Sequence, residues 1–328
     1  MKKKKVYSGI GGQAVLDGIM MKNKTEYSLA VRMPDGSIKV EKNEYLSFSD
    51  KYKILGLPFI RGIFSLIDSM KIGMKTLSRS AELVSNDDEI YEQTKFEKWV
   101  SEKLGDKAEK VLMGIITVFS FAFALCLFML VPAAIGSIFK KLVVGFPNQR
   151  FIFPNQRFII SFIEGISRII IFILYIKLVS RMPEIRTTFE YHGSEHKCIN
   201  CIESGLELTV DNVMKSSKEH KRCGTSFIVF VMIISIFFFM FIPTANIWQK
   251  FISRILLIPV VAGISYEVLR IMGCFDNKLV DILSRPGMWM QGLTTKEPNE
   301  KQVEVAIEAV SAVFDWKKFL KDNFGKEY

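Results

Sequence analysis

Histidine and cysteine are scarce in this chain of 328 residues, which has three histidines and five cysteines. The di-iron centres of membrane desaturases and hydroxylases need many more than three histidines, so that class is excluded. A single C-x-x-C, at Cys198 and Cys201, with no second copy, is weak evidence for a zinc ribbon or a redox centre. No Lys-Ser/Thr follows the glycine-rich stretch at residues 9–12, which argues against a phosphate-binding P-loop.

Long apolar runs are present instead. Four of them approach the roughly 20 residues that a helix needs to cross a bilayer: Val111 to Ile135, Phe158 to Val179, Ser226 to Trp248 and Ile252 to Met272. The first and third contain no charged residue. The second and fourth contain charges that we interpret as buried, functional or ion-paired positions, among them Glu164 with Arg168 and Glu267 with Arg270.

The net charge of +10 could suggest a nucleic-acid partner, but the lysines flank the apolar runs. Lys2 to Lys5 and the lysines between residues 71 and 110 resemble the positive flanks of cytoplasmic segments. The segment 181–225 has seven Lys/Arg, against four in 136–157 and two in 244–254. We therefore expect a multi-pass protein of the cell membrane with both termini and residues 181–225 in the cytoplasm, reduced cysteines, and no nucleic-acid partner. Its partners would be membrane lipids and a membrane protein or a second copy.

The fold class that we predict is a mainly α-helical integral membrane protein with about four transmembrane helices. Residues 1–53 would form a cytoplasmic β region, with a hairpin over residues 27–40. Residues 54–110 would hold an interfacial or re-entrant helix (54–77) and a charged helix (86–110). Residues 111–272 would be the membrane domain. Residues 273–328 would be cytoplasmic and include an amphipathic helix with Asn299 as its N-cap.

A duplicated heptad, FPNQRFI, occupies residues 146–159 between the first two spans. Two copies do not make a repeat architecture. We interpret it as a duplication tolerated in a loop, without a function of its own.

All three histidines lie between residues 190 and 223, in the stretch EYHGSEHKCINC and the EHKRC that follows. A helix over residues 188–204 would place His196 roughly 40° from His192, and Glu195 roughly 60° away on the other side. Two imidazoles one turn apart can hold one metal ion. Glu195 could be a third ligand, a base for a metal-bound water, or a partner that fixes a histidine tautomer.

His220 and Cys223 form a second candidate pair at the start of the third span. If the loop folds back, they would complete a set of three or four ligands with His192 and His196. Cys198 and Cys201 point to the opposite side of the predicted helix, so we do not expect them in this site. The alternative is an ordinary loop whose histidines cap helices or bond to carbonyls. H-x-x-E-H is also the inverted zinc-protease motif, but only these five residues are shared.

Four blocks together resemble the YqhQ-like bacterial membrane proteins, a family of unknown function described as predicted metal-dependent enzymes. They are GGQAVLDGIMM, EYHGSEHK, HKRCGTSF and RPGMWMQGLTTKEP. The resemblance implies His192, Glu195, His196, His220 and Cys223 as the residues behind the metal prediction. Lys221 stands where a proline is expected, and Cys198 and Cys201 are outside the pattern.

Two functions compete. The first is a membrane-embedded hydrolase that acts from the cytoplasmic side on a lipid-linked or membrane-proximal substrate. Zinc, or alternatively iron, would be held by the histidines and Cys223, with Glu195 as the catalytic residue. The second is a membrane scaffold or assembly factor whose metal only fixes the loop. A transporter resting on Glu164 and Glu267 is disfavoured, because no inverted repeat is visible in four spans.

Overall fold

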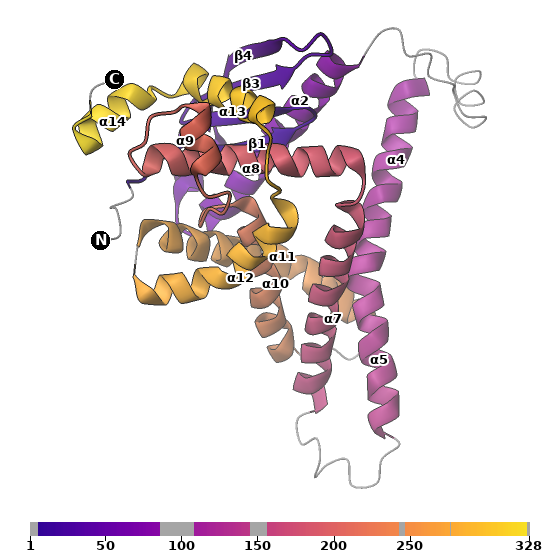
Figure 1. Cartoon of the computed structure of the whole chain (residues 1–328). Helices are drawn as coiled ribbons and strands as arrows, with labels where there is room; N and C mark the ends of the chain where they lie inside the picture. The colour runs from indigo at the N-terminus through magenta and orange to yellow at the C-terminus, as the bar shows by residue number, and fades with distance from the viewer. Residues whose placement is uncertain (1–5, 86–107, 145–155, 243–246, 276, 327–328) are drawn as a thin grey trace. The chain divides into compact units, whose positions relative to one another are not determined.

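The computed structural model describes residues 6–85, 108–144, 156–242, 247–275 and 277–326 (Figure 1). The chain divides into two compact units. The first comprises Met1–Asn86, Ile176–Val231 and Leu256–Tyr328, and the second comprises Asp87–Tyr175 and Met232–Ile255.

The first unit is built on a four-stranded antiparallel sheet with strand order β1-β2-β3-β4. The strands are β1 (Gly11–Val15), β2 (Gly18–Asn23), β3 (Glu26–Arg32) and β4 (Ile38–Glu44). Two-residue turns join β1 to β2 and β2 to β3, and each contains a residue with positive φ, Asp17 in the first turn and Lys24 in the second. The predicted hairpin is confirmed and is part of this larger meander.

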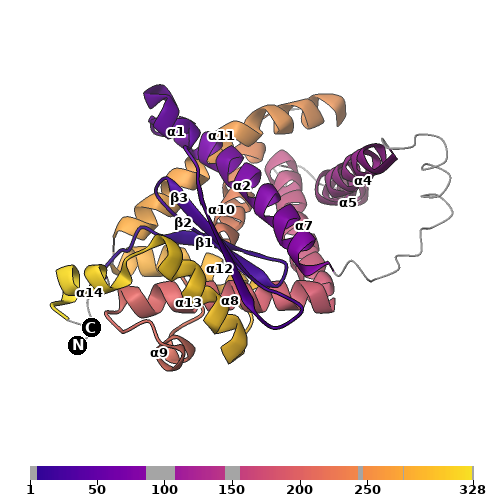
Figure 2. The same ribbon diagram turned by 90° about the horizontal axis from the view of Figure 1, so that it is seen from above.

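Both faces of the sheet are covered, as the view from above shows (Figure 2). Met20, Leu29 and Val31 pack on one face with Ile72 and Leu83 of α2 (Ile60–Val84). Alternation along the strands sends Ile19, Met21 and Ala30 to the other face. There they pack against α8 (Pro183–Glu203) and α13 (Glu300–Val313). The sheet is therefore the centre of the unit, with α8 held against it.

Short helices complete the first unit. They are α1 (Phe48–Lys51), η1 (Lys53–Gly56), α9 (Val210–Lys215), α12 (Lys278–Thr294) and α14 (Trp316–Phe324). The predicted C-terminal amphipathic helix is α13, and Asn299 is its N-cap in a capping box with Gln302. The predicted helix around the histidines is α8, and Gly205 adopts a positive φ just beyond its end.

Within the described residues, four helical segments are long and apolar enough to cross a membrane, which confirms the predicted number. They are Gly114–Leu142, Phe158–Val179, Gly224–Phe241 and Trp248–Gly273. The first span is made of α4 (Ala108–Leu125), η3 (Cys126–Leu130) and α5 (Val131–Val144). The other three belong, in order, to α7 (Gln156–Val179), α10 (Gly224–Phe241) and α11 (Ile247–Cys274). The charged segment 86–107 and most of the duplicated heptad lie outside the described residues.

The first span contains a π-helical turn, Cys126–Leu130, with a local cause. Pro132 has no N–H, so it cannot donate to the carbonyl of Phe128, four residues earlier. Arg168 of α7 supplies the missing donor through Nε at 3.0 Å. A carbonyl in the apolar span is thus satisfied by a neighbouring helix, as the absence of water there requires.

Charges in the spans pair between helices. Glu164 of α7 is 1% exposed and is bonded by Lys250 and Arg254 of α11, which replaces the pairing with Arg168 suggested by the sequence. In the first unit, Glu267 of α11 pairs with Arg61 of α2, and Glu267 also accepts the N–H of Phe59. The predicted helix in residues 54–77 is therefore α2, which begins at Ile60 beside α11 and continues to Val84.

Candidate metal centre

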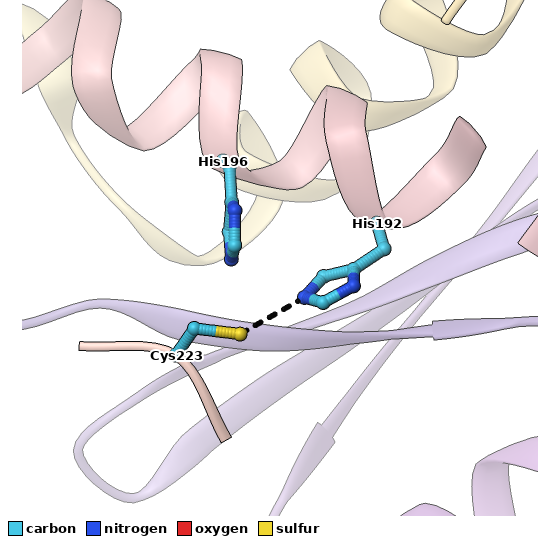
Figure 3. A group of neighbouring side chains, drawn as sticks. All are labelled: His192, His196 and Cys223. Carbon is cyan, nitrogen blue, oxygen red and sulfur yellow. Dashed lines mark hydrogen bonds between the residues drawn. The ribbon is translucent and has the colours of Figure 1, made fainter. Parts of the chain in front are cut away.

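His192, His196 and Cys223 come together at one point (Figure 3). The histidines lie one turn apart on α8, and Cys223 precedes the first residue of α10. Their ligand atoms all lie within 4.8 Å of one another, and His192 Nε2 is 3.2 Å from Cys223 Sγ. Residues 31 positions apart in the sequence thus converge because the chain folds back after α8.

Both imidazole rings are oriented by backbone carbonyls. His192 Nδ1 lies 3.0 Å from the carbonyl of Thr294, and His196 Nδ1 lies 2.7 Å from the carbonyl of Lys218. A carbonyl oxygen only accepts, so each Nδ1 carries the proton and each Nε2 presents a lone pair. Fixing the tautomer through the outer nitrogen is the usual arrangement of metal-bound histidines.

The donor set suits zinc. Two imidazole nitrogens and one thiolate form a combination that zinc accepts, and neighbouring ligand atoms of a tetrahedral zinc site lie roughly 3.5 Å apart. The separations in the His192, His196 and Cys223 group are of this order. Three protein ligands would leave a fourth position open, which is characteristic of catalytic rather than structural zinc sites.

Glu195 lies beside this group but is not part of it. Its Oε1 accepts the N–H of Gly12 in β1 at 2.9 Å. Its Oε2 is buried and has no hydrogen-bond partner among the residues that the structure describes. Burial raises the pKa of Glu195 above its ordinary value, and the neighbouring His192 and the Gly12 N–H oppose this only in part. The carboxyl group thus combines a fixed orientation with one buried oxygen to which no described residue bonds.

His220, which the sequence predicts as a ligand, lies next to the group without joining it. Its ring centroid is 5.8 Å from that of His196, and its Nε2 faces Glu203 Oε2 at 3.3 Å. Burial lowers the pKa of His220, which favours the neutral ring. Burial alone would raise the pKa of Glu203, but the hydrogen bond from His220 and the charge of Arg222 outweigh it and lower that pKa.

Gln291 holds the backbone at His220, and sequence reasoning gave it no role. Its side chain is fully buried in α12. Gln291 Oε1 accepts the His220 N–H at 2.9 Å, and Nε2 donates to the His220 carbonyl at 2.7 Å and to Ser226 Oγ at 2.9 Å. These bonds fix the segment that presents Cys223. In the sequence, Gln291 could have been singled out because it lies within RPGMWMQGLTTKEP, one of the four blocks of the family resemblance.

Cys198 and Cys201 lie in the hydrophobic core between α8, the sheet and α13. Both are fully buried, and Cys201 Sγ is 3.3 Å from the carbonyl of Glu207. Burial raises the pKa of Cys198 well above its ordinary value and that of Cys201 to about 11. They are therefore protonated core thiols, turned away from His192 and His196.

A cavity of about 560 Å³ opens in front of the group. His192, Glu195 and Cys223 lie in its wall, together with Gly12, Gln13 and Ala14 of β1. Residues of α2 and α8, the first residues of α10 and residues near the end of the α11 span complete the described lining. Its large apolar members include Leu66, Phe189, Phe227, Ile228 and Leu269. The volume is within the range of small-molecule and substrate sites.

Comparison with known proteins gives, over most of the chain, the family that the four sequence blocks resemble. Residues 57–316 match the family model "Protein of unknown function (DUF1385)". The chain is also 38% identical over 336 residues to "Uncharacterized protein YqhQ" of Bacillus subtilis (strain 168), covering 98% of each protein. No solved structure matches. The chain belongs to the DUF1385 family.

Proposed function

We propose that this DUF1385 protein is a membrane-embedded metal-dependent hydrolase with His192, His196 and Cys223 as ligands. The observation that carries the proposal is Glu195 Oε2, a buried carboxylate oxygen without a partner among the described residues. It lies in the wall of the same cavity as His192 and Cys223. A structural metal site has no need of such a group, whereas a hydrolytic site needs a base beside the open ligand position.

Zinc, for which iron is the alternative, would supply a Lewis acid and lower the pKa of a bound water. The residues of the chain do the rest. The carbonyls of Thr294 and Lys218 keep both Nε2 atoms directed at the ion. Gly12 holds one oxygen of Glu195, and the other takes a proton from the attacking water. The raised pKa of Glu195 suits a group that must accept and then return a proton.

The substrate that we propose is membrane-proximal. The cavity is lined at the start of one candidate span by Gly224, Thr225, Phe227 and Ile228, and near the end of another by Tyr266 and Leu269. A substrate embedded in the membrane surface would reach His192 without leaving an apolar environment. We assign the site to the cytoplasmic side from the distribution of Lys and Arg between the loops.

Metal analysis of the full-length protein in detergent tests the ligand set. We expect about one zinc per chain in the wild type and in Glu195→Gln, and a large loss in His192→Ala and His196→Ala. His220→Ala is the control for a nearby histidine outside the group and should retain zinc. Stoichiometric zinc in both His192→Ala and His196→Ala would contradict the proposed site.

Glu195→Gln separates hydrolysis from a scaffold with a structural metal. The amide keeps the size of the side chain and the acceptor for the Gly12 N–H, but it cannot take a proton at this position. We expect a loss of cellular function, measured by complementation of a deletion strain, by at least about a hundredfold in a rate-limited readout. Full complementation by Glu195→Gln with normal zinc content would favour the scaffold.

A further inference from the structure

β1 is an edge strand, because it pairs with β2 and with no other strand of the sheet. Val15 faces Gly18 across the two-residue turn, so the peptide groups of Val15, Gln13 and Gly11 bond to β2. Those of Gly12 and Ala14 point away from the sheet. Two hydrogen bonds agree with this parity, since the N–H of Gly12 bonds to Glu195 and that of Leu16 to Ser80 Oγ.

The outward edge of β1 borders the cavity. Gly12, Gln13 and Ala14 line it together with His192 and Glu195. The Gly12 N–H is occupied by Glu195, whereas the N–H and carbonyl of Ala14 make no hydrogen bond to any residue that the structure describes. A strand edge with a free donor and a free acceptor at Ala14 therefore lies alongside the candidate metal ligands. Such an edge binds an extended peptide as an added strand.

The remaining lining limits the charge of the ligand. Among the residues that the structure describes, no lysine or arginine lines the cavity, and Glu195 is the one carboxylate in its wall. A phosphate or pyrophosphate headgroup would find no basic side chain among these residues, and the proposed metal ion would be its only cationic partner. The apolar walls suit either an acyl chain or apolar side chains. Only a peptide also uses the alternating donor and acceptor of Ala14.

We infer that the cavity binds an extended, uncharged peptide segment paired with β1, and that the reaction is hydrolysis of a peptide bond. This inference rests on the proposed function and specifies its substrate. Water adds to the carbonyl carbon and loses a proton to Glu195 Oε2. The C–N bond then breaks, the proton passes to the departing nitrogen, and the products are a carboxylate and an amine.

Two substrates offered to the zinc-loaded, full-length protein in detergent test the inference. The first is a mixture of synthetic decapeptides with apolar, uncharged sequences, and new termini are detected by mass spectrometry. The second is p-nitrophenyl palmitate, an acyl ester without peptide groups. We expect cleavage of peptides, and none by Glu195→Gln.

Ala14→Pro tests the strand pairing itself. Proline removes the outward N–H and leaves the bonds of Gln13 and Val15 to β2, as edge strands tolerate. Peptide cleavage should fall roughly tenfold or more, as expected for the loss of one or two hydrogen bonds. Zinc content should stay normal, which separates a loss of strand pairing from a loss of the metal site.

The two proposals fail in different ways. Hydrolysis of the ester without cleavage of any peptide would overturn the peptide assignment and leave the hydrolase standing. Failure with both substrates, by protein that retains zinc, would overturn both. If Ala14→Pro does not fold, inhibition of the wild-type protein tests the peptide assignment instead. A tripeptide hydroxamate should inhibit ester or peptide hydrolysis at least tenfold more strongly than acetohydroxamate, and equal inhibition would overturn the inference.

Discussion

Gln291→Met probes how the candidate site is held together. Methionine has a similar length and flexibility, so the substitution leaves little empty volume in the fully buried position. It removes every polar atom of the side chain. The His220 N–H loses its acceptor, the His220 carbonyl loses its donor, and Ser226 Oγ loses a partner. The change is thus confined to hydrogen bonding around a single backbone position.

The expected cost follows from those lost bonds. A buried group left without its partner costs about 1–3 kcal/mol. Two backbone groups at His220 are affected, and Ser226 Oγ can still donate elsewhere, so we expect the free energy of unfolding to fall by roughly 2–6 kcal/mol. Because His220 is three residues before Cys223, the thiol should also lose its fixed position. We expect zinc affinity to fall about 10–100-fold, as for other partners that orient metal ligands.

Unfolding by denaturant in mixed micelles measures the first quantity, and competition with a chromophoric chelator measures the second. Gln302→Met is the matched control. Gln302 is also buried, accepts the Asn299 N–H at 2.9 Å and donates to Glu190 at 3.0 Å, but it belongs to the capping box of α13. It should lose stability without losing zinc affinity. Zinc affinity within twofold of the wild type in Gln291→Met would refute the role of Gln291 in presenting Cys223.

Two further predictions concern residues outside the site. Cys198→Ala removes a core thiol at 0% exposure. We expect the free energy of unfolding to fall by roughly 1 kcal/mol, while the zinc content, measured by metal analysis, stays unchanged. Loss of zinc would show that Cys198 is a ligand after all. Arg168→Met leaves the Phe128 carbonyl without its donor and should cost about 1–3 kcal/mol in micelle unfolding assays. Adding Pro132→Ala restores a backbone N–H for that carbonyl and should recover much of the lost stability. A double variant as unstable as Arg168→Met would contradict this explanation of the π-helical turn.

Local patterns were sufficient to predict the elements of the fold. Apolar length predicted four spans, alternation predicted the hairpin, and Asn299 predicted the start of α13. The i, i+4 spacing of His192 and His196 likewise placed both rings on one face of α8. Each of these follows from a repeat or a cap within about 20 residues of sequence.

Contacts between distant segments could not be predicted in this way. The Gly12 N–H reaches Glu195 across 183 residues, and Gln291 reaches His220 across 71. No periodicity encodes such pairs, because they depend on how α8 and α12 dock. The same limit applies to Arg168, whose sequence neighbour Glu164 looked like its partner. In the structure, Arg168 bonds to a carbonyl that Pro132 leaves without a donor, a relation between two helices.

The sequence left three roles open for Glu195, and the contacts favour one of them. A ligand would belong to the group of His192, His196 and Cys223, but Glu195 lies outside it. A partner that fixes a tautomer would accept from an imidazole Nδ1, but both Nδ1 atoms face backbone carbonyls. The remaining role is the base, which is the role that we propose. Gly12 fixes one oxygen, and the second is buried without a partner among the described residues, where a proton could be taken from a ligand in the cavity. Because that fixed oxygen depends on an outward N–H of β1, the strand that would align a peptide also orients the proposed base. Substrate binding and proton transfer would then share one element, and a shift of β1 should impair both together.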